Sequence, residues 1–119
     1  MTGVLFEGGS FRPVFSCGVM DALLDADIMF PYCIGVSAGA ANAASYISRQ
    51  RERNIRVIER YRNDKRYFSK RNYLHDKSIF GIDFVFREIP NYIDPFDMET
   101  FKSYDGNFVI VTTDALTGV

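Results

Sequence analysis

The sequence predicts an α/β fold in three layers, α/β/α, with a mainly parallel central sheet. An apolar segment over residues 4–6 precedes a helical stretch over residues 13–26, and a second apolar segment over residues 32–36 runs directly into an alanine-rich helical stretch. Strand, helix and strand in this order and length form the parallel crossover unit, which is right-handed by default. Ligands on such sheets lie beyond the carboxyl ends of the strands, so a site is expected there.

The remaining elements are predicted from periodicity and turn residues. The first helix has apolar residues at helical spacing, namely Val14, Phe15, Val19, Leu23 and Ala26. Further helices are expected over residues 54–67, 79–89 and 97–104, and Pro90 is expected to end the second of these. Residues 108–113 predict a strand, and the glycine-containing turn after it predicts a returning strand of which the sequence includes only Val119.

One serine lies where the second strand meets its helix, in the sequence Gly35-Val36-Ser37-Ala38-Gly39. The G-x-S-x-G pattern at such a boundary is typical of a nucleophile elbow, in which the serine hydroxyl projects from the top of the sheet. The amino end of the helix favours negative charge that develops there. Gly35 and Gly39 are expected to permit the close approach of helix and strand, which a β-carbon would obstruct. Ser37 is therefore the predicted nucleophile.

A second glycine cluster, Glu7-Gly8-Gly9-Ser10-Phe11-Arg12, follows the first strand. Attack by a serine on an acyl carbon places negative charge on the carbonyl oxygen, and aligned backbone N–H groups stabilise it by roughly 3 kcal/mol each. The predicted donors of this oxyanion hole are Gly8, Gly9 and Ser10. Glycine-rich turns also bind nucleotide phosphates, but the dinucleotide fingerprint needs glycines where this chain has Ser10 and Pro13.

The two motifs together resemble the patatin-like phospholipase family, in which a glycine-rich oxyanion turn precedes a G-x-S-x-G elbow by a few tens of residues. Gly8, Gly9 and Arg12 match the family turn G-G-G-x-Arg/Lys-G, and Ser37 falls on the nucleophile. Residues 91–101 and 108–118 are similar to the bacterial branch, so the resemblance covers nearly the whole chain. It implies a serine acyl hydrolase that acts on acyl esters of lipids or phospholipids.

Two residues depart from the family turn. Ser10 replaces a glycine, and its N–H donor survives if the turn keeps its shape without a positive φ at that position. Pro13 replaces the last glycine and removes an N–H, although proline suits the first position of a helix. Arg12 either steadies the turn, meets a phosphate head group or forms a structural salt bridge. A weakened or altered activity therefore stays open.

A serine hydroxyl needs a base, and this chain has a single histidine. His75 lies in a polar segment between two helical stretches and is typical of a solvated loop. The resemblance implies a serine-aspartate dyad instead, with the aspartate in a late Asp-Gly-Gly or Asp-Gly-Ala motif. Asp105-Gly106 is interpreted as a turn into the following strand. Residues 1–119 are therefore expected to form the N-terminal part of one domain, inactive alone, with the dyad aspartate beyond residue 119.

The net charge of −1 hides a basic segment, because residues 49–71 contain ten lysines and arginines but three acids. Such a segment can attract an anionic membrane or cover a core stripe of Ile55, Ile58 and Tyr61 with a solvated face. Nucleic acid is not an expected partner, because no nucleic-acid motif is present. The apolar residues 79–86 predict either a buried helix or the wall of an acyl-chain pocket or lipid-facing surface.

Two cysteines, Cys17 and Cys33, fall in a helix and a strand where a small thiol packs well. The sequence shows no secretory leader, no apolar run long enough to span a bilayer, and no cluster of metal ligands. The expected location is the cytoplasm, in part at the membrane periphery, and no cofactor or metal is expected. Two alternatives to the hydrolase stay open on the same fold: a lipid-binding or regulatory module that has lost turnover, and an acyltransferase.

Overall fold

A computed structural model describes residues 2–118 and contains a three-stranded sheet in the order β1-β2-β3. The strands are β1 (Val4–Phe6), β2 (Tyr32–Val36) and β3 (Asn107–Val111). β2 pairs parallel with both neighbours, and the registers match Phe6 with Gly35 and Val36 with Val111. The α/β class and the parallel sheet are confirmed. The returning strand expected at Val119 lies outside the described residues.

Six helical segments connect and cover these strands in the described residues: α1 (Val14–Asp25), α2 (Ala38–Ile47), α3 (Arg53–Tyr61), α4 (Asn72–Asp76), the π-helix η1 (Phe84–Ile93) and α5 (Met98–Lys102). The predicted end of a helix at Pro90 is wrong, because η1 continues through it to Ile93. A π-helix has a wider turn than an α-helix and so accommodates a ring that an α-helix interior excludes. The prediction also placed the end of α3 too late and did not include α4.

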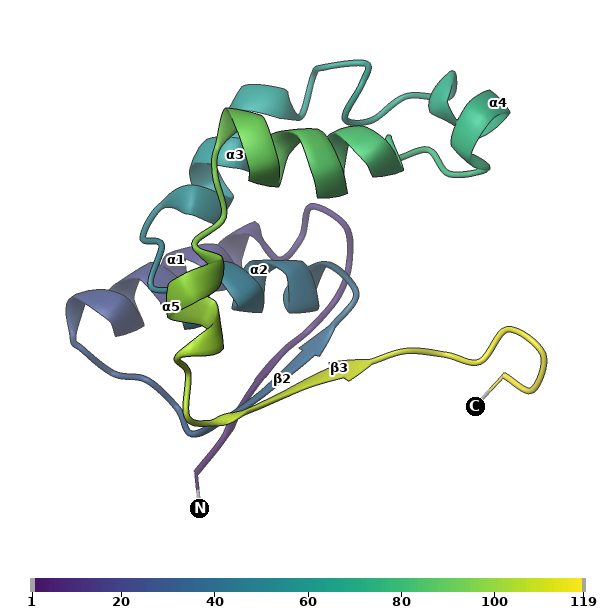
Figure 1. Cartoon of the computed structure of the whole chain (residues 1–119). Coiled ribbons are helices and arrows are strands. Elements are labelled where there is room, and N and C mark those ends of the chain that lie inside the picture. Colours follow the sequence, from purple (N-terminus) through teal and green to yellow (C-terminus); the bar gives the residue numbers. More distant parts are fainter. Residues whose placement is uncertain (1, 119) are drawn as a thin grey trace.

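The helices of the described residues lie over one face of the sheet, with α2 packed directly on β1 and β2 (Figure 1). Two right-handed crossovers that progress in the same direction along a sheet place their helices on the same side. α3 and η1 form a further level above α1 and α2, and α4 projects from the end of that level (Figure 1). The opposite sheet face leaves Leu5, Val109 and Val111 exposed. Residues 2–118 thus form the sheet and one helical side of the predicted α/β/α arrangement.

The main core lies between the sheet and α1 and α2. Its buried members are Phe6, Met20, Cys33, Ala43, Tyr46 and Ile47. α1 contributes Cys17 and Met20, whereas Val14, Phe15 and Val19 are exposed. The predicted apolar stripe is therefore wrong for these three residues, whereas Leu23, also part of it, is half-buried against the core. α1 has apolar residues on more than one side, and its contact with α2 selects the side that is buried.

Two smaller clusters hold the upper level in place. Tyr61, Phe84 and Ile89 form a second core between α3 and η1. Phe11, in the turn after β1, packs its ring against Tyr67, Phe68 and Phe80, with centroid separations of 5.6 to 6.2 Å. Aromatic pairs at such distances contribute about 1 kcal/mol each beyond the area that they bury. The turn after β1 is therefore anchored to residues that lie more than fifty positions later in the chain.

The basic segment 49–71 is partly neutralised within the fold. Five of its ten basic residues are paired with acids: Arg49 with Asp27, Arg51 with Asp25, Arg53 and Arg56 with Asp94, and Arg66 with Asp64. The stripe of Ile55, Ile58 and Tyr61 faces inward, with Tyr61 buried and the two isoleucines half-buried. Among residues 2–118, no helix is long and apolar enough to cross a membrane.

Candidate active site

Ser37 occupies the single residue between β2 and α2. Its backbone has φ 53° and ψ −125°, a conformation that few residues other than glycine adopt. A serine at the N-cap of a helix usually accepts a hydrogen bond from the first turn, but the side chain of Ser37 makes no such bond. The side chain is also exposed. The sharp turn therefore presents a hydroxyl group that the helix does not use.

Gly35 and Gly39 have the steric role that the sequence predicts. A β-carbon on Gly35 would collide with the backbone of Ala40, and one on Gly39 would collide with the carbonyl oxygens of Phe6 and Glu7. The second contact joins the first turn of α2 to the end of β1. Absence of a side chain at these two positions is what lets α2 start against the sheet.

The glycine turn after β1 lies against Ser37. A β-carbon on Gly8 would lie 2.9 Å from Cβ and 3.6 Å from Oγ of Ser37. Within residues 2–118, the backbone N–H groups of Gly8, Gly9 and Ser10 donate no hydrogen bond. Segments nearly thirty residues apart in the chain thus place a hydroxyl group beside free backbone donors.

The shape of the turn depends on positive φ angles at Gly9 (128°) and Ser10 (55°). The sequence prediction required the turn to keep its shape without a positive φ at Ser10, and this is not the case. Ser10 instead adopts a backbone conformation that glycine adopts more easily than serine. Pro13 is buried and precedes the first residue of α1, as predicted. Arg12 lies 3.9 Å from Glu7 in an exposed ion pair, and its backbone N–H donates to the Gly9 carbonyl oxygen.

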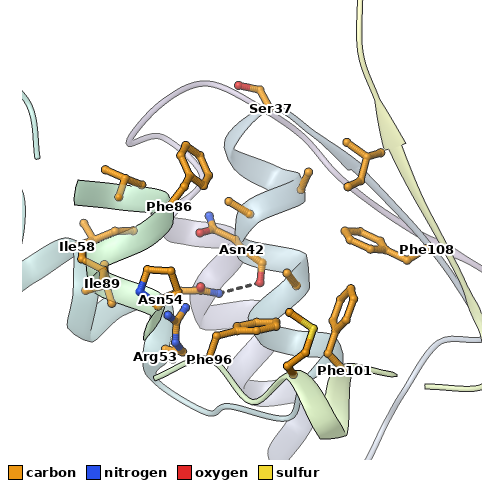
Figure 2. A pocket seen from close by; sticks show the side chains of 18 of the residues that line it. Ser37, Asn42, Arg53, Asn54, Ile58, Phe86, Ile89, Phe96, Phe101 and Phe108 are labelled. Carbon is orange, nitrogen blue, oxygen red and sulfur yellow. Dashed lines mark hydrogen bonds between the residues drawn. The ribbon is translucent and has the colours of Figure 1, made fainter. Parts of the chain in front are cut away.

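An apolar cavity of about 500 Å³ begins at Ser37 and follows α2. Figure 2 shows Ser37 at its rim, with Phe86 near the opening and with Phe96, Phe101 and Arg53 at the other end. Ala41 and Ala44 form part of its α2 wall. This volume lies in the range of sites that bind drug-sized molecules. The cavity is suited to an extended apolar group attached to an atom near Ser37.

A second cavity of about 330 Å³ adjoins the first and reaches the end of the glycine turn at Ser10. It is lined by Ser10 and Phe11 as well as Ser37, and by Phe80 and Ile82 from the segment before η1. Both cavities share Phe86, so residues 79–86 form a cavity wall rather than only a buried helix. Of the two interpretations of that segment, the pocket wall is the one that the geometry fits.

Asn42 is a polar lining residue that sequence reasoning missed. It lies on α2 and lines both cavities, and its backbone oxygen accepts a hydrogen bond from the Asn54 side chain at 2.9 Å (Figure 2). An asparagine five residues after the predicted nucleophile has no motif of its own. Its position after Ser37 on a helix that lines a pocket was the available signal.

The described residues supply no base next to Ser37. The residues that line the two cavities include no aspartate, glutamate or histidine. His75 lies exposed in α4, where a loop was expected. Asp105 precedes β3, whereas Ser37 follows the paired strand β2, so the two lie at opposite ends of the parallel sheet. The interpretation of Asp105-Gly106 as a turn into a strand is confirmed.

The thiols are structural. Burial raises the pKa of Cys17 to about 11, and burial also raises the pKa of Cys33. Both cysteines are free and buried, as expected for unreactive thiols in a core. Among residues 2–118, no group of three or more histidine, cysteine, aspartate and glutamate side chains is arranged to hold a metal ion.

A model of the patatin-like phospholipase family matches residues 4–114. The chain is 28% identical to YjjU, an uncharacterised protein of Escherichia coli (strain K12), over 95 residues that make up 79% of this chain and 26% of that relative. The chain therefore spans about a quarter of the length of YjjU. No solved structure gives a significant match. Since the family model covers nearly all of the chain, the protein belongs to the patatin-like phospholipase family.

Proposed function

We propose that the protein is a serine acyl hydrolase in which Ser37 is the nucleophile and the N–H groups of Gly8, Gly9 and Ser10 form the oxyanion hole. Family membership supports a lipid hydrolase or esterase in general terms. The observation that carries the specific proposal is the contact of Gly8 with the side chain of Ser37. The nucleophile and the N–H donors must face the same reacting carbonyl group, and the contact between Gly8 and Ser37 puts them close enough to do so.

The reaction has two steps. The Ser37 oxygen attacks the carbonyl carbon of an acyl ester while a base takes the hydroxyl proton, and the negative charge on the carbonyl oxygen is held by the backbone donors. The bond to the leaving alcohol then breaks, the alcohol takes a proton, and the acyl group stays on Ser37. Water attacks the acyl-serine in the second step and releases the fatty acid. The positive end of the α2 dipole favours the same negative charge.

The base is proposed to be an aspartate beyond residue 119. The absence of acids and histidine from the lining of both cavities supports this proposal for residues 2–118. Residues 1–119 then form the N-terminal part of a single domain and are inactive without the rest. The coverage of only 26% of YjjU agrees with a longer protein of this type.

A lipid acyl ester is the proposed substrate class. The larger cavity carries aromatic and aliphatic side chains along most of its length, and its polar lining residues are Ser37 at the rim, Asn42 on α2, and Arg53 and Asn54 at the far end (Figure 2). An acyl chain attached to the reacting carbon at Ser37 has about 500 Å³ of apolar space beside it. Burial of each methylene group contributes about 0.8 kcal/mol.

A lipid-binding module without turnover is the second candidate. Two departures from the family turn favour it: Ser10 holds a strained positive φ in place of a glycine, and Pro13 has no N–H where the family has a glycine. An acyltransferase uses the same acyl-serine and differs in its acceptor, an alcohol in place of water.

Hydrolysis by the full-length protein that contains residues 1–119 separates these candidates. Release of fatty acid from mixed micelles of a diacyl phospholipid is measured for the wild type and for Ser37→Ala. The hydrolase releases fatty acid, and Ser37→Ala abolishes the release. Binding of the micelles without release supports the binding module, and formation of a new ester when glycerol is added supports the acyltransferase. Release that Ser37→Ala leaves unchanged contradicts the proposal.

A further inference from the structure

A cluster of apolar side chains is exposed over residues 68–86. Their exposed fractions run from 38% to 73%, and the members are Phe68, Tyr73, Leu74, Ile79, Ile82 and Phe86. Single exposed apolar residues need no explanation, but a cluster of large ones marks an interaction site. We call residues 68–86 the apolar arm. α4 lies in this arm and projects from the rest of the molecule (Figure 1).

The apolar arm is an ordered structure. Phe68 and Phe80 form an antiparallel bridge, and Ser69 N–H donates to the Ile79 carbonyl oxygen at 2.9 Å. The backbone N–H of Ile82 donates to the carboxylate of Asp76. These bonds close the chain on both sides of α4, so Tyr73 and Leu74 are held on an ordered loop.

Cations without a local partner accompany the apolar side chains. No carboxylate in residues 2–118 lies within ion-pair distance of Lys70, Arg71 or Lys77. Of the two acids of the arm, Asp83 is paired with Arg87, whereas Asp76 accepts the N–H of Ile82 and keeps its negative charge, so three unpaired basic residues accompany one unpaired acid. Exposed leucine and tyrosine next to unpaired basic residues are the combination that binds the surface of an anionic bilayer.

The arm also borders the candidate active site. Ser78, Phe80, Ile82 and Phe86 line the smaller cavity together with Ser10 and Ser37. A bilayer that meets the exposed side of these residues therefore lies next to the opening of the cavity. A lipid that leaves the bilayer there reaches Ser37 across an apolar surface and not through water.

We propose that the apolar arm binds the surface of anionic lipid bilayers, with Leu74 and Tyr73 inserted at the interface and Lys70, Arg71 and Lys77 against the head groups. The sequence predicts a membrane contact over residues 49–71, but five arginines of that segment are paired with acids. The contact is therefore proposed for the end of the segment and the residues after it. We further infer that this surface delivers lipid substrate to Ser37, and this second step rests on the proposed hydrolase function. Binding to the bilayer does not depend on that function and can be measured without any reaction.

Sedimentation with vesicles tests the binding. The full-length protein is mixed with vesicles of phosphatidylcholine, with or without about 30 mol% phosphatidylserine as the anionic lipid. We expect binding to the anionic vesicles that weakens with added salt. Leu74→Ser should weaken it about tenfold, and the double variant K70Q/K77Q roughly 30-fold. All of these side chains are exposed, so the variants should fold.

Matched variants elsewhere on the surface control for loss of apolar area and of charge. Leu116→Ser removes a leucine that is 97% exposed outside the arm, and R60Q/K102Q removes two positive charges from α3 and α5. Both controls should bind as the wild type does. Absence of binding by the wild type, or equal losses in the control variants, overturns the proposed role of the arm.

Ser37→Ala distinguishes this result from the proposed reaction. It should bind vesicles normally while it releases no fatty acid. Vesicle binding without hydrolysis by the wild type contradicts only the proposed reaction. Hydrolysis of a soluble ester by a protein that binds no vesicles contradicts only the arm as a membrane surface.

Discussion

Gly8 and Ser37 are in direct contact, because a β-carbon on Gly8 would lie 2.9 Å from Cβ of Ser37 and 3.0 Å from the carbonyl oxygen of Val36. The residues lie in different turns, each at the carboxyl end of a parallel strand. Pairing of β1 with β2 brings these ends together, and Gly39 lets α2 start against the end of β1. The contact links the predicted oxyanion donors to the predicted nucleophile.

Gly8→Ala should slow acylation of Ser37 about 100-fold, because the new methyl group must displace either the turn or the serine. Reaction of the full-length protein with a fluorophosphonate, followed over time, measures this rate. Gly18→Ala is the matched control, since a β-carbon at Gly18 meets no atom within 4 Å. It should leave the rate unchanged. Equal rates for Gly8→Ala and the wild type would mean that the turn plays no part in the reaction.

Ser10→Gly should stabilise the turn. A residue other than glycine at φ 55° costs about 1 to 2 kcal/mol, and glycine adds about 0.5 to 1 kcal/mol of unfolded-state entropy. The net gain in free energy of unfolding is therefore up to about 1 kcal/mol, with faster acylation if strain displaces the N–H donors. Urea unfolding measures the first effect. Ser10→Ala keeps the positive φ and should give no gain; a gain as large as that of the glycine variant would contradict the role of backbone strain.

Asp94→Asn should destabilise the protein by about 2 kcal/mol, because Arg53 is buried against this carboxylate. The side chain of Asp94 also accepts hydrogen bonds from Arg56 at 2.6 and 3.0 Å. Thermal unfolding at neutral pH measures the loss. Asp25→Asn breaks an exposed pair with Arg51 and should change the melting temperature little. Equal losses in the two variants would mean that burial of Arg53 does not matter.

The same carboxylate makes stability depend on pH. Hydrogen bonds from Arg56 and the charges of Arg56 and Arg53 lower the pKa of Asp94 in the folded protein. The unfolded chain, with a pKa of about 3.9, then binds more protons than the folded protein in the acid range. The contribution of Asp94 to the free energy of unfolding is therefore complete at a pH above the pKa in the unfolded chain. It disappears as the pH falls through the pKa in the folded protein. Between pH 5 and 2, Asp94→Asn should lose less stability than the wild type does.

Cys17 should resist alkylation in the folded protein. Burial raises the pKa of its thiol to about 11, so at pH 8 only about one thiol in a thousand is ionised. Mass spectrometry after treatment with iodoacetamide should show modification of Cys17 in urea but not in buffer. Modification at similar rates in both conditions would contradict the placement of Cys17 in the core.

The G-x-S-x-G pattern and the glycine cluster were predictable because they are short motifs, each directly after a recognisable strand. The contact that requires glycine at position 35 is with nearby Ala40, whereas the contact that requires it at position 39 is with Phe6 and Glu7, more than thirty residues earlier. The positive φ of Ser10 was not predictable, because the turn obtains its shape from the packing of Phe11 on Tyr67, Phe68 and Phe80. Such long-range packing leaves no local signal.

The errors in the helices have the same origin. Val14, Phe15 and Val19 follow helical spacing, but the contact of α1 with α2 buries Cys17 and Met20 instead. Pro90 normally ends an α-helix, and a π-helix removes that restriction. The pairing of the arginines in residues 49–71 with Asp25, Asp27 and Asp94 joins distant segments, so the segment appeared more basic in the sequence than it is in the fold.

The most direct measurement is the site of covalent modification by a fluorophosphonate on the full-length protein. This reagent phosphonylates a serine that is activated as a nucleophile and faces an oxyanion hole. Peptide mapping by mass spectrometry should place the adduct on Ser37, with one adduct per chain and none in Ser37→Ala. An adduct on another residue, or no adduct on folded protein that binds lipid, would contradict the assignment of Ser37 as the nucleophile.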